Sequence, residues 1–156
     1  MIHSRLFHIL WMCCLVLLAS CGADQNLKKG EKFLALGEYF DAADQFKQAY
    51  TKTPTKERTE RGKIALKMAH CYDKINATPK AIAAYRNAIR YKQASVSDRL
   101  AYARMLLKNG EYKQAEKEFQ VVLDSLPTNT LAQNGLKSAQ LAPKWKKKGS
   151  RYKVKR

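Results

Sequence analysis

The sequence lacks the short motifs that mark most enzyme active sites. Its 156 residues contain no glycine-rich phosphate loop, no HExxH pair and no nucleophile elbow. Histidine is scarce, with three copies, and nothing near His70 marks it as half of an acid–base pair or as a metal ligand. We therefore expect a protein that is not an enzyme and that needs no cofactor and no metal ion.

Acidic residues are also few. Asp and Glu number 13 against 30 Lys and Arg, which gives a formal net charge of +17. A charge of this size indicates anionic partners and says nothing of the fold. The apolar content of 46% is ordinary, so the composition and length fit one folded domain.

A run of apolar residues long enough to cross a membrane is missing. Residues 6–19 are apolar except for one histidine, but a bilayer needs ~20 residues, and this length is typical of a secretory signal. The run ends in Leu-Ala-Ser-Cys-Gly, residues 18–22, which resembles a bacterial lipobox. The resemblance implies a signal peptide over residues 1–20, a diacylglycerol on Cys21 and a short tether over residues 21–26. An ordinary signal peptide with a chance cysteine is the alternative.

Cysteine is then nearly absent from the processed chain. Cys13 and Cys14 would leave with the signal and Cys21 would be acylated, so no internal disulfide is expected. The remaining Cys71 lies on an apolar helix face, and we expect a buried small side chain. In some lipoproteins an aspartate directly after the acylated cysteine retains the protein in the inner membrane. Gly22 stands at that position here, so inner-membrane retention is not expected. The resemblance implies a lipid anchor in the outer membrane that faces the periplasm, with surface exposure left open.

One stretch occurs three times, over residues 37–49, 76–88 and 110–122. Each copy has a small residue, an aromatic one four positions later, and a small or β-branched one three further on. The small anchors are Ala42, Ala81 and Ala115, so the spacings are 39 and 34 residues. A 34-residue period with this pattern resembles the tetratricopeptide repeat, a helix–turn–helix unit.

The upstream half of each copy agrees with this resemblance. It carries a small residue and, three positions on, a large apolar one: Gly30 with Phe33, Ala69 with Tyr72, and Ala103 with Leu106. The usual tryptophan is missing from all three copies, and Gln93 stands where the second copy should have its proline. The resemblance implies an all-α, right-handed solenoid of three repeats plus a C-terminal capping helix, over residues 24–142. A plain helical bundle with chance spacing is the alternative.

Local signals predict where the helices begin and end. Gly37 and Asn109-Gly110 close first helices, Thr55 caps the start of the second repeat, Thr78 caps a helix that opens with Pro79, and Ser95, Ser97 and Asp98 open the third repeat. Thr128-Asn129-Thr130 precedes the capping helix, which runs from Leu131 to about Leu141, and Pro143 stops it. Seven helices are expected.

The tetratricopeptide resemblance also implies a binding surface. In that family the first helix of each repeat lines a concave groove, and the matching positions here are Leu27, Glu31, Leu34, Lys63, Leu66, His70, Asp73, Leu100, Arg104, Leu107 and Asn134. Leu27, Leu66 and Leu100 occupy corresponding places, where relatives that clamp a peptide carboxylate have lysine and asparagine, so a carboxylate clamp is not implied. A mixed apolar and charged groove suits an extended or helical peptide. The leucines alternatively pack against neighbouring helices.

The last stretch, residues 143–156, changes character. It holds no acid and eight bases: Lys144, Lys146, Lys147, Lys148, Arg151, Lys153, Lys155 and Arg156. A block of like charge is usually a disordered interaction tail. Three interpretations stay open: binding of anionic lipid or glycan, stacking of Trp145 and Tyr152 on nucleic acid, and a linker to a further domain. A lipidated envelope protein rarely meets nucleic acid, so we do not expect nucleic acid as a partner.

The repeats and the tail together are similar to the N-terminal part of larger envelope lipoproteins that continue into a β-propeller and an OmpA-like domain. Some of these serve type IX secretion. The sequence contains neither later domain, so peptidoglycan binding is not implied, and the chain would be a shortened relative or an interrupted reading frame. We expect a lipid-anchored adaptor that binds envelope proteins or peptides. The alternative is an electrostatic binder that uses the tail, with the repeats as a spacer.

Overall fold

The computed structural model describes the backbone of residues 22–152 and the side chains of residues 22–142. This part of the chain is all α-helical, as expected. A first helix spans residues 22–35. Six more follow: α2 (Tyr39–Lys52), α3 (Arg58–Lys74), α4 (Thr78–Arg90), α5 (Val96–Asn109), α6 (Tyr112–Ser125) and α7 (Thr130–Tyr152).

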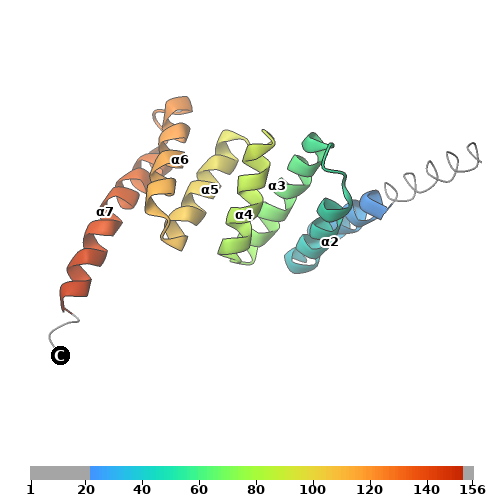
Figure 1. The fold of residues 1–156 in the computed structure, drawn as a ribbon, viewed down its shortest axis with the longest axis horizontal. Coiled ribbons are helices and arrows are strands. Elements are labelled where there is room, and N and C mark those ends of the chain that lie inside the picture. Colours follow the sequence, from blue (N-terminus) through green and yellow to red (C-terminus); the bar gives the residue numbers. More distant parts are fainter. Residues whose placement is uncertain (1–21, 153–156) are drawn as a thin grey trace, which may run out of the picture.

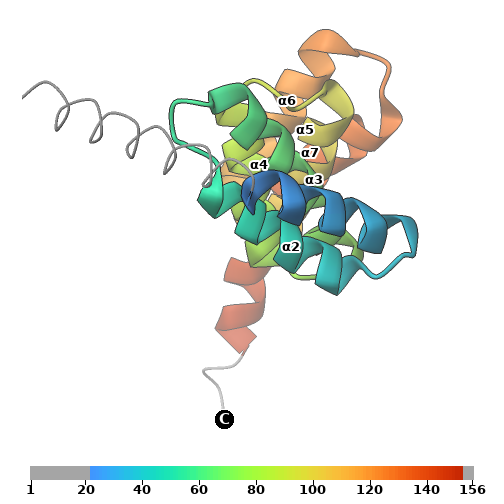
Figure 2. The same ribbon diagram turned by 90° about the vertical axis from the view of Figure 1, so that its right-hand side faces the viewer.

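The helices form a row in which each packs against the next along the chain (Figure 1). Residues 22–35 pair with α2, which Asn26 and Gly30 contact through Gln48 and Phe46. The α3 helix pairs with α4 and α5 pairs with α6, so three hairpins stand side by side, and α7 packs against α6 and also touches α5. Figure 2 shows the first hairpin at the front and the C-terminal part of α7 projecting beyond the row. Three repeats and a capping helix were the expected order.

The core repeats the small-and-aromatic pattern of the sequence. Ala42, Ala81 and Ala115 are fully buried, and so are Phe46 and Phe119 one turn after two of them. The hairpins close tightly over these rings. A Cβ atom added to Gly30 would lie 2.6 Å from the Phe46 ring, and one added to Gly135 would overlap the Phe119 ring. Glycine is therefore required in the facing helix at both ends of the solenoid.

Most of the expected helix ends are confirmed. Gly37 and Gly110 adopt the left-handed conformation at φ 76° and 81°, which side chains disfavour. Ser95 and Asp98 form a reciprocal capping box at the start of α5. The Asn129 carboxamide oxygen accepts a hydrogen bond of 2.9 Å from the Ala132 amide and so caps α7.

The prediction that Thr55 caps the second repeat was wrong. The link after α2 is longer than expected, and α3 begins at Arg58 behind Glu57, with no side-chain cap. In the first turn of α3, the Glu60 carboxylate lies 3.6 Å from the Lys63 ammonium. The start of α4 differs by one residue, because Ala77 is the cap and Thr78 already lies in the helix.

The prediction that Pro143 stops the capping helix was also wrong, because α7 continues to Tyr152. A proline removes one backbone hydrogen bond, but the lysines that follow are good helix formers. At the other end, residues 22–26 were assigned to a tether and instead begin the first helix. Asn26 explains this, since it is 5% exposed and donates a 2.8 Å hydrogen bond to Gln48 of α2.

Candidate functional site

The first helices of the repeats share one side of the row, which we call the first-helix face (residues 22–35, α3, α5 and the start of α7). One ion pair and one hydrogen bond join them. Lys67 of α3 lies 2.6 Å from Glu31, and His70 of α3 lies 2.7 Å from Asp98 of α5. Since α5 also touches α7, these helices are successive neighbours, and the predicted groove residues belong to them.

The leucines of the predicted groove are half-buried. Leu27, Leu34, Leu66, Leu100 and Leu107 each pack against the core cluster while part of the side chain stays accessible. Packing against neighbouring helices and lining a groove are therefore both compatible with their positions. The polar members are Glu31, Lys63, His70, Arg104 and Asn134, all exposed, and Asp73, which is half-buried.

Several charges on this face are already matched inside the protein. Glu31 is held by Lys67, a residue that the sequence analysis did not select, and the Lys67 ammonium also lies 5.7 Å from the centre of the Phe46 ring. Arg104 differs, since its side chain has no ion pair or hydrogen bond to the residues that the structure describes. Arg104 is thus the cation most available to an acidic group of a ligand.

Tyr85 lies under the middle of the face. Its ring centre is 5.9 Å from that of His70 and 6.3 Å from that of Tyr102, and the side chain is almost fully buried. Burial raises the pKa of Tyr85 well above its usual value, the charges of Asp73 and Asp98 raise it further, and Arg104 opposes them. The hydroxyl therefore stays protonated, within the field of acids and a base that border the groove.

Asp98 joins the second and third repeats. Burial raises its pKa, but hydrogen bonds from the Ser95 hydroxyl and amide, together with His70, outweigh burial and hold the pKa below its usual value. The sequence indicated Asp98 only as a helix start. Its contact with His70 depends on how α3 and α5 approach each other, and no local signal could show that.

Cys71 is fully buried and is a free thiol, as expected. Burial raises its pKa to about 11, and the nearby Lys67 charge lowers it by less. A thiol with this pKa is almost wholly protonated at neutral pH. Its role is packing.

A pocket of about 220 Å³ lies outside the predicted groove, between α2, α3 and α4. Its lining is Lys47, Met68, Tyr72, Lys80, Ala83, Ala84 and Asn87. The Lys80 ammonium sits 5.7 Å from the centre of the Tyr72 ring. No sequence signal indicated this pocket, because it forms only where α2, α3 and α4 meet, and among its lining residues only Tyr72 belongs to the repeated pattern.

Within residues 22–142, no three His, Cys, Asp or Glu side chains gather closely enough to hold a metal ion. Among the described helices, none combines the length and the apolar character that crossing a membrane requires. Other predicted sites lie outside the described side chains. These are Cys21 and the tail bases Lys144, Lys146, Lys147, Lys148, Arg151, Lys153, Lys155 and Arg156.

No protein-family model and no curated protein matches this sequence. Solved structures do match in fold. The C-terminal TPR-containing domain of a putative FK506-binding protein from Plasmodium falciparum superposes with a TM-score of 0.65 at 18% identity, over 83% of this chain and 93% of that one. The first TPR of Spaghetti (RPAP3), bound to the HSP90 peptide SRMEEVD, gives 0.61 at 19% identity, over 79% and 94%.

A third example is the second TPR domain of human RPAP3 in complex with the HSP70 peptide SGPTIEEVD. It gives a TM-score of 0.59 at 17% identity, over 79% of this chain and 96% of that one. Identities this low establish fold and nothing more. The chain therefore has the fold of a tetratricopeptide-repeat solenoid, with three helical hairpins followed by a seventh helix.

Proposed function

We propose that this protein is a non-enzymatic, lipid-anchored adaptor that binds envelope proteins or peptides through its first-helix face. The observation that carries the proposal is the composition of that face. Half-buried leucines from all three repeats alternate with exposed charges, and Arg104 makes no ion pair or hydrogen bond within the described part of the chain. Such a surface offers apolar contact and a fixed charge to an extended or helical segment.

The neighbours in fold support peptide binding as a use of this architecture. Two of them hold peptides that end in Glu-Glu-Val-Asp. A ligand that presents a bare carboxylate to the first repeat fits this chain poorly, because Leu27 and Glu31 stand there and Glu31 would repel it. We infer a ligand with apolar side chains over Leu66 and Leu100 and an acidic group near Arg104.

The same proposal includes a lipid anchor at Cys21 and an outer-membrane location facing the periplasm. It also includes a role in a secretion or assembly machine such as the type IX system. The lipobox-like residues 18–22 support the anchor. We expect Cys21→Ser to move the full chain from the membrane fraction to the soluble fraction of its host and to abolish labelling by radioactive palmitate. Retention of the label would contradict lipidation at this residue.

The adaptor proposal is tested by affinity capture from solubilised envelopes at low and high salt, with bound proteins identified by mass spectrometry. We expect Leu66→Glu and Leu100→Glu to lose, by tenfold or more, a partner that wild type retains at high salt, because a charge placed among apolar contacts is costly. Arg104→Glu reverses an exposed, unpaired charge, so it should weaken capture without unfolding the chain.

The matched control is Leu126→Glu, which changes an exposed leucine at the end of α6, away from the first-helix face. Circular dichroism melting shows which variants remain folded. Capture that is unchanged in folded groove variants, or that falls equally in the control, would exclude the groove. Capture that disappears at high salt for wild type would favour an electrostatic partner instead.

A further inference from the structure

The outward side of the first helix is basic and ends in an exposed leucine. Lys28, Lys32 and Leu36 recur every four residues and Lys29 lies beside them, so the four form one stripe, which we call the outer stripe. All four are exposed, and Leu36, at 73%, is the most exposed of the large hydrophobic side chains described. The groove positions of this helix face elsewhere, towards the core and α3.

The lysines of the outer stripe, Lys28, Lys29 and Lys32, have no ion-pair or side-chain hydrogen-bond partner among the described residues. Glu31 of the same helix pairs with Lys67 of α3 instead. Asp24 borders the stripe one turn before Lys28 and offsets one charge at most. Two net positive charges or more therefore remain along one side of a single helix, with an apolar side chain at its end.

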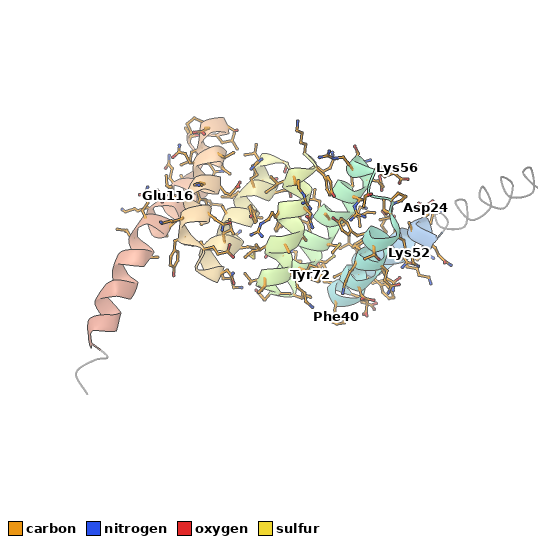
Figure 3. All side chains as sticks on the ribbon, in the orientation of Figure 1. Asp24, Phe40, Lys52, Lys56, Tyr72 and Glu116 are labelled. Carbon is orange, nitrogen blue, oxygen red and sulfur yellow. The ribbon has the colours of Figure 1, made fainter. Side chains whose placement is uncertain are left out.

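The outer stripe lies at one end of the solenoid, where no further repeat packs over it among the described elements. Residues 22–35 form one end of the solenoid together with α2, and Figure 2 shows both helices at the front. In Figure 3, Asp24 and Lys52 mark the end where the helix begins, and Phe40 marks the turn where the hairpin closes. The helix is about 20 Å long at ~1.5 Å per residue. The stripe therefore offers an extended line of contacts and suits a surface better than a single small ligand.

We propose that the outer stripe lies along an anionic lipid surface, with the three lysines at the headgroups and Leu36 at the acyl boundary. Lysine stems can lie along apolar material while their ammonium groups stay at the headgroups, and basic side chains are attracted to acidic lipid. The inference deepens the proposed function and depends on the Cys21 anchor only for where the surface is met. An anchor directly before residue 22 would hold one end of the helix, and the stripe would fix its orientation. The first-helix face would then open sideways, clear of the bilayer.

The test measures binding of residues 22–156, which include every described element, to vesicles of phosphatidylglycerol and phosphatidylcholine in equal parts. The eight bases of the tail are changed to Gln in every sample, so that only the solenoid contributes. We expect Lys28, Lys29 and Lys32→Gln together to weaken binding on the order of 100-fold, at about fivefold per lysine. Vesicles of phosphatidylcholine alone should bind none of the samples.

The chain offers two matched controls. Lys113, Lys117 and Lys137→Gln removes the same charge from exposed positions at the far end, and Leu131→Ser changes a leucine that is 61% exposed. We expect both controls to bind as the parent does, and Leu36→Ser to bind several-fold more weakly. Equal weakening by the two lysine triples, or no binding of the parent to anionic vesicles, would overturn the proposal. Because Cys21 is absent from these samples, the result is independent of lipidation and of partner capture.

Discussion

Phe46→Ala should lower the free energy of unfolding by ~3–5 kcal/mol, whereas Phe40→Ala, six residues earlier in the same helix, should change it by less than about 0.5 kcal/mol. Phe46 is 0% exposed and Phe40 is 69% exposed. The two changes remove the same atoms from α2 and differ in burial alone. Urea denaturation followed by circular dichroism measures both.

The cost at Phe46 should lie at the high end for a physical reason. The ring lies directly against the Gly30 backbone, so the first helix cannot move closer to fill the cavity without disturbing the whole hairpin. Small domains are stable by only about 5–15 kcal/mol, and a three-repeat solenoid has no spare repeat. The Lys67 ammonium also lies over this ring, so the loss should loosen the Glu31–Lys67 pair on the first-helix face.

A cost at Phe46 below about 1 kcal/mol would mean that the first hairpin contributes little to the folded state. An equal loss of stability for Phe40→Ala would contradict the assignment of Phe46 to the packed side of α2 and Phe40 to the exposed side. The repeats unfold together only if their interfaces are strong. The urea transition should therefore be followed by circular dichroism and by tryptophan or tyrosine fluorescence, and the two curves should coincide if unfolding is two-state.

The sequence predicted the features that repeat locally. Ala42 with Phe46 and Ala115 with Phe119 recur at fixed spacing, and the physics of close helix packing needs nothing from distant residues, so the hairpins and their core followed. Gly37, Gly110 and the Ser95–Asp98 cap are also local, since each acts within one turn of its own helix.

The sequence could not show which side chains meet between helices of different repeats. It also could not show whether a single helix-breaking residue such as Pro143 would end its helix. Pairing of His70 with Asp98, and of Lys67 with Glu31, requires the distance between helices of different repeats. Pro143 was predicted to end α7, and the helix continues past it. The predicted groove residues lie on the first helices, and their use as a ligand-binding groove remains a prediction.

The long link between the first two repeats contains the residue with the second large expected effect. The spacing of 39 rather than 34 residues leaves extra chain after α2, and Arg61 ties it down. Its guanidinium donates hydrogen bonds to the Tyr50 carbonyl at 3.0 Å and the Thr53 carbonyl at 2.6 Å. It also lies 4.0 Å from the centre of the Tyr50 ring.

Arg61→Ala should lower the free energy of unfolding by about 2–4 kcal/mol, because two charge-assisted hydrogen bonds to the carbonyls of Tyr50 in the last turn of α2 and of its C-cap Thr53 are lost. Those carbonyls have no partner within their own helix. Arg61→Lys keeps the charge but loses the planar guanidinium over the Tyr50 ring, so its stability should fall between those of the alanine variant and wild type. Thermal and urea unfolding measure both variants.

Arg58→Ala is the matched control, because Arg58 lies in the first turn of the same helix and touches a single ring, Tyr91, at 5.8 Å. An exposed contact of this kind is worth about 0.5–1 kcal/mol. A cost at Arg61 no larger than the cost at Arg58, or a lysine variant as stable as wild type, would show that the link is not held by the guanidinium. If Arg61 does hold it, the five extra residues are tolerated because one side chain replaces the tighter turn that the 34-residue spacing would provide.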